Sequence, residues 1–462
     1  MQFIENRTYD ELKVGDTAAL TRTLRQEDIA LFAVLSGDVN PAHLDAEFAK
    51  TDMFHRIVAH GMWGGALISA VLGTELPGPG TVYLAQSLHF RRPVGLGDTI
   101  TTSVTVREKR DAARVLLDCI CRNQTGDTVI EGEAEVIAPT EKVKRPRALL
   151  PQVHVHTPGA CHQRFIAAAR KLSPIRTAII HPVDELSLRG ATEASAAGLI
   201  EPVLVGPIEK VKRAAEAASV NLGQLEIIDA PHSHAAAERA VQLVREGRIE
   251  ALMKGALHTN EILNVVVRAD SGLRTERRMS HIYLLDVPHY PKPLFITDAA
   301  INIYPTLNDK RDIVRNAIDL CHALGIATPK IAILSAVETI EPKISSTLDA
   351  AALCKMADRG QIGGGLLDGP LAFDNAVSKA AVAAKQIVSP VAGDADVLVA
   401  PDLESGNMLA KQLIYLAGAA SAGIVLGARV PIMLTSRADD IPARIASCAL
   451  ALLVVRHRGG GA

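Results

Sequence analysis

The spacing of apolar and polar residues changes character near residue 140. Before that point, three segments alternate apolar and polar positions in steps of two, which predicts half-buried β-strands. These segments are residues 98–107, 113–121 and 128–137. Ahead of them, residues 60–73 are apolar on nearly every side, which predicts a buried helix. A buried helix wrapped by an antiparallel sheet predicts an α+β domain over residues 1–140.

After residue 158, short apolar runs alternate with alanine-rich helical stretches. Such runs predict buried parallel strands, and the alternation predicts a doubly wound α/β domain over residues 159–462. The expected strands are residues 176–182, 202–207, 250–255, 293–298, 329–335, 395–402 and 430–436. Between the two patterns lies a basic stretch with four prolines, 138–158, and we expect a linker at 141–158.

Composition narrows the classes of partner and compartment. The formal net charge is -2, and no basic stripe runs along the chain, so nucleic acid is not an expected partner. No segment reaches the roughly 18 uninterrupted apolar residues of a membrane helix, and the polar N-terminus does not resemble a secretory signal. The six cysteines are scattered without a C-x-x-C pair, which predicts free buried thiols and a cytoplasmic location.

The segment LSGDVNPAHLD, residues 35–45, has strong turn chemistry and follows a short helix expected at 26–34. It places Asp38 and His43 on one loop, near enough to share a water molecule. Such a pair can take a proton from water and return one to carbon, while an N–H at the start of the next helix, at Gly61, stabilises a developing enolate oxygen. From spacing alone, an Asx turn with a capping histidine remains the alternative.

Three motifs give this region a family resemblance. The runs SGDVNPAHLD, IVAHGMWGGALIS and HFRRPVGLGDTI, within residues 5–138, resemble the MaoC-like, R-specific enoyl-CoA hydratases of the hot-dog fold. The resemblance implies that Asp38 and His43 are the catalytic pair and that the N–H of Gly61 contributes to the oxyanion hole. It also assigns Asn40 to substrate binding and Ser69, on the central helix, to catalysis. It further implies a homodimer or a higher even oligomer.

In the second region, several polar residues follow predicted strands or begin predicted helices, and Arg268 lies on the helix that follows His258 and Thr259. Because ligands bind at the carboxyl ends of strands in open α/β sheets, we take these residues as binding candidates. The candidates are Lys254, His258, Thr259, Arg268, Asp298, Ser335, Asp402, Ser436, Arg437 and Asp439. Lys254, His258 and Thr259 lie where a strand ends and a helix begins, which favours anions. Exposed arginines and ordinary helix caps remain the alternative explanation for each group.

The motifs MKGALHTNEIL, RMSHIYLLD, ITDAAINIYP, DGPLAFDNAVS, APDLESGNML and PIMLTSRAD resemble the phosphate acetyltransferase/phosphate butyryltransferase family over about residues 160–458. The resemblance implies that Ser436 and Arg437 bind the acyl phosphate and that Arg268 contacts phosphate. It implies an isocitrate dehydrogenase-like fold of two subdomains, one of residues 159–300 plus 430–462 and one of 301–429. Asp439 stands closer to the Ser-Arg pair than the proposed base of the acetyl-specific branch, so the thiol base and the acyl preference stay open.

No dinucleotide fingerprint, P-loop or zinc-binding motif occurs, so we expect no metal and no tightly bound cofactor, only coenzyme A thioesters and phosphate as substrates. Together the two resemblances predict a bifunctional acyl-CoA enzyme. One alternative is an active hydratase whose second domain binds CoA thioesters without catalysis. Another is a nonenzymatic acyl-CoA-binding protein built from the same two folds.

Overall fold

The computed structural model describes residues 3–459, apart from 151–152, 154, 156–158 and 435–438. The chain divides into two compact units, residues 1–155 and 156–462. No helix within the described ranges has both the length and the apolar character needed to cross a membrane.

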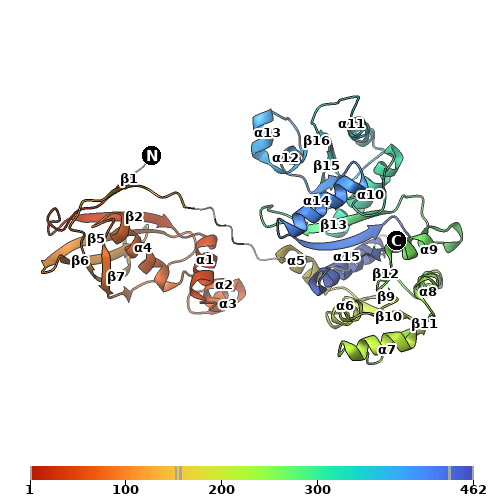
Figure 1. The fold of residues 1–462 in the computed structure, drawn as a ribbon, viewed down its shortest axis with the longest axis horizontal. Helices are drawn as coiled ribbons and strands as arrows, with labels where there is room; N and C mark the ends of the chain where they lie inside the picture. Colours follow the sequence, from red (N-terminus) through yellow and green to blue (C-terminus); the bar gives the residue numbers. More distant parts are fainter. Residues whose placement is uncertain (1–2, 151–152, 154, 156–158, 435–438, 460–462) are drawn as a thin grey trace. The chain divides into compact units, whose positions relative to one another are not determined.

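The first unit is built on a six-stranded antiparallel sheet that curves around one helix (Figure 1). Five strands pair in the order β2-β5-β6-β7-β3, and β4 pairs with β7. Their bounds are β2 Thr17–Thr23, β3 Val82–Gln86, β4 His89–Phe90, β5 Thr99–Arg110, β6 Arg114–Arg122 and β7 Thr128–Ile137. The helix, α4 (Gly61–Thr74), buries Leu67, Ile68 and Val71 in the core, together with alternate residues of the strands. The alternating pattern in the sequence therefore corresponds to the buried face of this sheet.

Three short helices lie between β2 and α4: α1 (Gln26–Ser36), α2 (Pro41–Leu44) and α3 (Ala46–Thr51). Gly37 ends α1 with φ 75°, a left-handed conformation that glycine adopts without strain. Asn40 begins α2, where its side-chain oxygen accepts a hydrogen bond from the Ala42 N–H at 3.1 Å. The turn chemistry at 35–45 thus produces two helix ends and a short loop between them.

Part of the expected linker belongs to the first unit. Strand β8 (Lys144–Pro146) pairs antiparallel with β1 (Phe3–Glu5). Ion pairs join Glu5 to Lys142 at 3.5 Å and to Lys144 at 3.0 Å. The basic cluster that suggested a solvated linker is held here by a carboxylate, so residues 142–146 are not linker.

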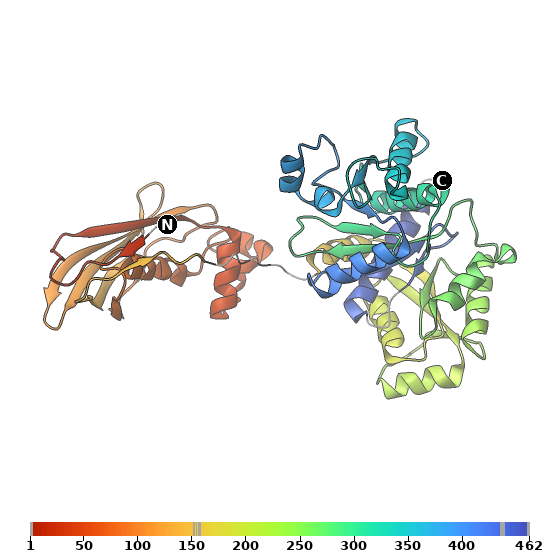
Figure 2. The same ribbon diagram turned by 45° about the horizontal axis from the view of Figure 1, so that its top comes forward.

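The second unit contains an eleven-stranded sheet with helices on both faces (Figures 1 and 2). The strand order is β11-β10-β9-β12-β19-β18-β13-β14-β17-β15-β16. The strands are β9 Ile175–Ile180, β10 Ile200–Gly206, β11 Glu226–Asp229, β12 Ala251–Lys254, β13 Ser280–Asp286, β14 Leu294–Thr297, β15 Lys330–Leu334, β16 Leu366–Leu371, β17 Val397–Val399, β18 Ala420–Leu426 and β19 Ile432–Met433. Successive residues of β9 enter different cores: Ile179 belongs to one apolar cluster and Ile180 to another. Burial on both faces explains why these strands are continuous apolar runs in the sequence.

The helices of this unit alternate with the strands. They are α5 Ala160–Ala169, α6 Glu185–Ala196, α7 Ile208–Ala217, α8 Ser233–Arg245, α9 Thr259–Val267, α10 Leu307–Ala323, α11 Ser345–Asp358, α12 Phe373–Val377, α13 Lys379–Lys385, α14 Leu403–Tyr415 and α15 Ile441–Gly459, with a 3₁₀ turn, η1, at Ala269–Ser271. Helix α15 packs against α5, α6, α10 and β18 and is buried along most of its length.

The sheet is mixed, whereas the sequence pattern predicts parallel strands. Strand β13 runs antiparallel to both of its neighbours, β14 and β18, and β18 is also antiparallel to β19. As a result, β14, β17, β15 and β16 run opposite to β12 and β19. The predicted strand ends therefore fall on two different edges of the sheet. The sequence analysis missed β11, β13, β16 and β18, of which β13 and β18 cause the reversal.

Candidate active sites

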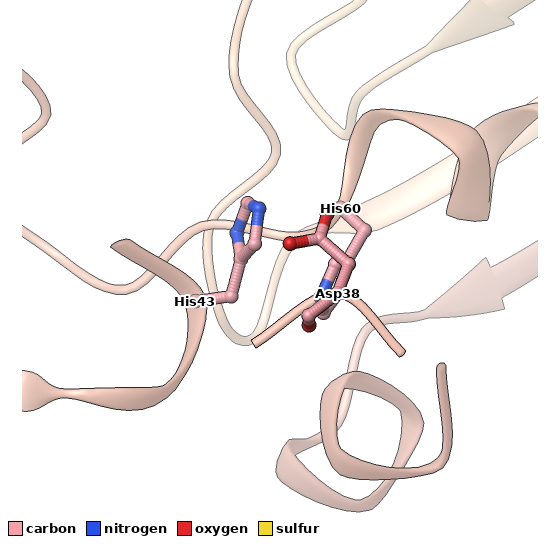
Figure 3. Close-up of side chains that lie close together, drawn as sticks. All are labelled: Asp38, His43 and His60. Atoms are coloured by element: carbon pink, nitrogen blue, oxygen red, sulfur yellow. Dashed lines mark hydrogen bonds between the residues drawn. The ribbon is translucent and has the colours of Figure 1, made fainter. Parts of the chain in front are cut away.

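Asp38, His43 and His60 come together in the first unit, although they lie on three different segments (Figure 3). Asp38 follows the end of α1, His43 lies on α2, and His60 directly precedes α4. One side-chain ligand atom from each residue lies within 4.8 Å of the others. The structure thus brings together Asp38 and His43, which the sequence places on one loop, and adds a second histidine.

His43 is oriented by the backbone. Its Nδ1 donates a hydrogen bond to the carbonyl oxygen of Val58 at 2.8 Å. In a neutral imidazole this leaves the lone pair on Nε2, which is the nitrogen available to accept a proton. The half-buried side chain lines a cavity, where a neutral imidazole can serve as a general base.

His60 is the residue that the sequence analysis missed. It is 3% exposed, and its Nε2 donates to the main-chain oxygen of Asp38 at 3.0 Å. Its ring lies 4.0 Å from that of His43 and 5.0 Å from that of Phe32, measured between centroids. The remaining nitrogen, Nδ1, is buried without a hydrogen-bond partner among the described residues. The signal in the sequence was its place directly before Gly61, where a helix begins.

A cavity of about 460 Å³ opens beside this cluster. His43, His60 and Gly61 line one part of it. Its buried apolar wall consists of Val58, Trp63, Val94 and Ile130, and its exposed rim includes Met53, Arg91 and Arg92. Because Gly61 is the first residue of α4, its N–H has no partner within the helix and is available to a ligand oxygen.

The two other predicted residues of this unit, Asn40 and Ser69, lie in different positions: Asn40 is next to Asp38, and Ser69 is away from the cavity. Asn40 caps α2, and its own N–H donates to Asp38 Oδ1 at 3.1 Å, so it shapes the loop that carries the aspartate. Ser69 is exposed, does not line the cavity, and lies eight residues along α4 from Gly61, about 12 Å by helical rise. The prediction that Ser69 acts beside Asp38 and His43 is not met within a single chain, because the helix carries it away from them.

In the second unit, Lys254, His258 and Thr259 lie where β12 ends and α9 begins. Lys254 is 6% exposed. Strand β12 pairs in parallel with β19, and the last paired residues are Met253 and Met433. Ser436 and Arg437 follow at positions outside the described residues. This pairing therefore places the start of the MKGALHT segment beside β19, the strand that precedes the predicted Ser-Arg pair in the sequence.

The turn between β12 and α9 is tightly packed. A Cβ atom on Gly255 would lie 2.4 Å from the carbonyl oxygen of Ile180, so only glycine fits. At the start of α9, the carboxylate of Glu261 accepts a hydrogen bond from the His258 N–H at 2.8 Å. The hydroxyl of Ser233, which also donates to Glu261, lowers the pKa of that carboxyl.

A second cavity, of about 470 Å³, lies beside Asp439, the first described residue after 435–438. Its lining includes His162, Tyr415, Ser421, Asp439 and Asp440. Asp440 begins α15, accepting from the Ala443 N–H at 3.0 Å. Burial lowers the pKa of His162, so this imidazole is neutral at pH 7. Among the predicted residues that the structure describes, Asp439 is the one that lines this cavity.

Three predicted residues, Asp298, Ser335 and Asp402, follow strands that run opposite to β12. Ser335 and Asp402 line another cavity of about 490 Å³, together with the ion pair of Lys310 and Asp349 at 2.7 Å. Asp402 caps α14 by accepting from the Ser405 N–H at 2.8 Å. These residues share a pocket with each other, but not with Lys254.

Asp298 has a structural role in place of the predicted contact with substrate. It is 3% exposed, and its carboxylate accepts hydrogen bonds from four backbone N–H groups at 3.0–3.2 Å. The donors are His281, Ala300, Ile301 and Asn302. The buried carboxylate thus holds the turn after β14 through these hydrogen bonds.

Arg268 lies at the far end of α9 from His258, ten residues away and thus about 15 Å by helical rise. Its guanidinium forms ion pairs with Glu238 at 2.8 Å and with Asp270 at 3.0 Å. The structure does not bring it to the strand end where Lys254 and His258 lie.

Each of the two units matches a known protein family or domain. Residues 234–452 match the family model described as phosphate acetyl/butaryl transferase, and residues 12–118 match that of the MaoC like domain. The phosphate acetyltransferase of Rhizobium meliloti is 59% identical over 297 residues, covering 64% of this chain and 94% of the relative. The chain belongs to the phosphate acetyl/butyryltransferase family.

Solved structures resemble each unit separately. A branched-chain phosphotransacylase from Enterococcus faecalis is 29% identical, with a TM-score of 0.54, and the match covers 61% of this chain and 99% of the other. R-hydratase PhaJ1 from Pseudomonas aeruginosa is 46% identical, with a TM-score of 0.33, and the match covers 34% of this chain and all of the other. The match of residues 12–118 to the MaoC like domain shows that this member of the phosphate acetyl/butyryltransferase family also contains a MaoC-like domain, as the sequence motifs predict.

Proposed function

We propose that the chain is a bifunctional enzyme of acyl-CoA metabolism. Its first unit reversibly hydrates trans-2-enoyl-CoA to 3-hydroxyacyl-CoA, and its second unit reversibly transfers an acyl group between CoA and phosphate. The convergence of Asp38 and His43 beside a cavity that Gly61 also lines carries the first assignment. Membership of the phosphate acetyl/butyryltransferase family carries the second.

The hydration requires three groups, and the first unit has a candidate for each. Water adds its oxygen to the β-carbon of the enoyl thioester while the Asp38–His43 pair removes its proton. The free Nε2 of His43 is the acceptor that the hydrogen bond to Val58 leaves open. The thioester oxygen gains negative charge, which the N–H of Gly61 at the start of α4 stabilises. The pair then returns a proton to the α-carbon, so one water is consumed for each double bond.

The acyl transfer requires a thiolate aimed at the acyl carbon and groups that hold the departing phosphate. The CoA thiolate attacks the carbonyl carbon of the acyl phosphate, the C–O bond to phosphate breaks, and phosphate leaves with its charge. Arg437 is suited to hold the phosphate in a bidentate contact, and Ser436 to donate a hydrogen bond to it. The 59% identity with a phosphate acetyltransferase supports acetyl as the preferred group. Asp439, whose neighbourhood is a cavity, is our candidate for the thiol base.

We also propose that the enzyme works as a homodimer or a higher even oligomer in the cytoplasm. Strand β3 is at one end of its sheet, and among the described residues of the first unit it pairs with β7 alone, so its other edge is open there. Val82, Tyr83 and Leu84 on this strand, and Met62 on α4, are exposed apolar side chains. A second copy that adds a strand at β3 satisfies the open edge and covers these side chains. Light scattering should then give an even multiple of the 49.1 kDa chain mass.

A paired assay on the purified chain tests both activities. Hydration of crotonyl-CoA is followed by loss of the enoyl absorbance, and phosphate-dependent release of CoA from acetyl-, propionyl- and butyryl-CoA by a thiol reagent. The Asp38→Asn variant should lose only the first activity, and Arg437→Ala only the second. A chain that hydrates crotonyl-CoA but releases no CoA with any acyl group contradicts the second assignment and favours a silent CoA-binding unit.

A further inference from the structure

The cavity beside His43 has two chemically different ends. Its rim carries Arg91 and Arg92, both exposed, which form ion pairs with Glu131 at 2.6 Å and with Asp127 at 3.4 Å. Its inner wall consists of apolar side chains that are less than 10% exposed: Val58, Trp63, Val94 and Ile130. An enoyl-CoA has a charged nucleotide end and an apolar chain. Burying phosphate charge against this wall is costly, so the chain is the part that enters.

Trp63 is the largest side chain of that wall and the only tryptophan of the protein. It is 6% exposed and lies in the first turn of α4, two residues after Gly61. If the thioester oxygen meets the Gly61 N–H, the carbons that follow the double bond extend toward residues of this same turn. The indole therefore stands next to the path of the acyl chain.

The wall has little freedom to recede from a longer chain. A Cβ on Gly64, the next residue of α4, would lie 2.2 Å from Cδ1 of Ile130, so the helix and β7 are in direct contact there. Ile130 is 3% exposed and Val94 9% exposed, and both belong to the main core cluster of the unit. Close-packed interiors resist the movement needed to admit extra methylenes. The volume of the indole thus sets how far the cavity reaches.

We infer that Trp63 is the specificity residue that limits the hydratase site to short enoyl chains, with four carbons preferred over eight. The inference rests on the proposed hydration. A single methylene too many in an apolar pocket changes kcat/KM by about 10- to 200-fold, so four extra carbons that meet the indole reduce it strongly. Replacing the indole by a smaller apolar side chain opens space where the chain would otherwise collide.

The test compares kcat/KM for octenoyl-CoA and crotonyl-CoA in the full-length protein. The C8:C4 ratio should be below about 0.01 in the wild type and at least about tenfold higher in Trp63→Leu. Trp63→Phe, which keeps most of the ring, should change it by less than about threefold. Because both substrates are measured on one preparation, partial unfolding of a variant cancels in the ratio.

Leu67→Ala is the matched control. Leu67 is also 6% exposed and lies on α4, but it does not line the cavity, so its loss should leave the ratio unchanged. A wild type that hydrates both chain lengths equally well, or a Trp63→Leu variant with the wild-type ratio, overturns the inference while the hydratase assignment stands. A wild type that hydrates neither substrate overturns the proposed hydration itself.

Discussion

His60 donates a hydrogen bond from Nε2 to the main-chain oxygen of Asp38 at 3.0 Å. Two other hydrogen bonds of Asp38 join it to residues two positions away in the sequence. Its N–H donates to Ser36 Oγ at 3.2 Å, and its Oδ1 accepts from the Asn40 N–H at 3.1 Å. His60 thus joins the loop that carries the aspartate to the start of α4, where the N–H of Gly61 lies. One side chain thus links the two parts of the unit that we propose supply the acid-base pair and the oxyanion donor.

Two substitutions of His60 separate its hydrogen bond from its ring contacts. His60→Gln places a donor near the position of Nε2 but removes the ring, whereas His60→Phe keeps a ring against His43 and Phe32 but has no donor. Because misplacement of a catalytic group by about 1 Å costs on the order of 100-fold in rate, we expect His60→Phe to lose about 100-fold in kcat for crotonyl-CoA hydration. His60→Gln should keep most of the activity, with KM near the wild-type value in both.

A purely structural role for His60 predicts another pattern. Both variants would then lose activity in proportion to their loss of folded protein, which thermal unfolding measures directly. Equal kcat values for correctly folded His60→Gln and His60→Phe would show that the hydrogen bond to Asp38 does not position the site.

The two proposed active sites should respond to substitution independently. His43→Gln removes the free Nε2 that we assign as proton acceptor and should lower crotonyl-CoA hydration by about 100- to 10,000-fold. Phosphate-dependent CoA release should stay within about twofold of the wild type, because His43 lies in a separate compact unit. Both assays on one preparation check this prediction. Parallel loss of the two activities would indicate coupling between the units.

The first unit was largely predictable because its sequence signals are local. Period-two alternation gives β5, β6 and β7, and turn residues at 35–45 place Asp38 and His43 together. His60 could not be found in this way, since its contact with Asp38 spans 22 residues and depends on how α4 docks. The same holds for the distance of Ser69 from the cavity, which is a consequence of helical rise.

The second unit shows the limit of pattern analysis. A short apolar run identifies a buried strand but carries no information about its direction. The antiparallel pairings of β18 and β13 with their neighbours therefore separate Lys254 from Ser335 and Asp402, which the pattern treats as equivalent strand ends. Asp298 follows a strand as a ligand-binding residue should, yet four backbone N–H groups occupy its carboxylate.

Gly255 is a position where a single methyl group should disturb the second unit. In Gly255→Ala the new Cβ meets the Ile180 carbonyl oxygen at 2.4 Å, and backbone atoms on both sides must shift. We expect a loss of about 1–3 kcal/mol in the free energy of unfolding. The variant should also have lower acyltransferase activity, because Lys254 and the start of α9 move with it.

Gly363→Ala provides the comparison for Gly255, since a Cβ there has no atom within 4 Å. It should leave both the unfolding free energy and CoA release near wild-type values. Urea unfolding of the two variants, followed by a probe of the second unit, decides the matter. A Gly255→Ala protein as stable as Gly363→Ala would mean that the close approach of the two backbones is not as constrained as its distance indicates.

The six cysteines should be nearly inert in the folded protein. Four are buried and two are half-buried, and all are free thiols. Burial raises the pKa of Cys119 and of Cys448 to about 12 each, and the pKa of Cys161 to about 11. A raised pKa keeps the thiol protonated, and only the thiolate reacts with an alkylating reagent. Reaction at pH 8 is therefore slow because little thiolate is present and because the thiols are buried.

Iodoacetamide followed by mass spectrometry should find Cys119 and Cys448 unmodified in the native protein and all six modified in urea. Of these three thiols, Cys161 has the pKa that is raised least, so it should be labelled first. Rapid labelling of Cys448 in the native protein at pH 8 would contradict the packing of α15.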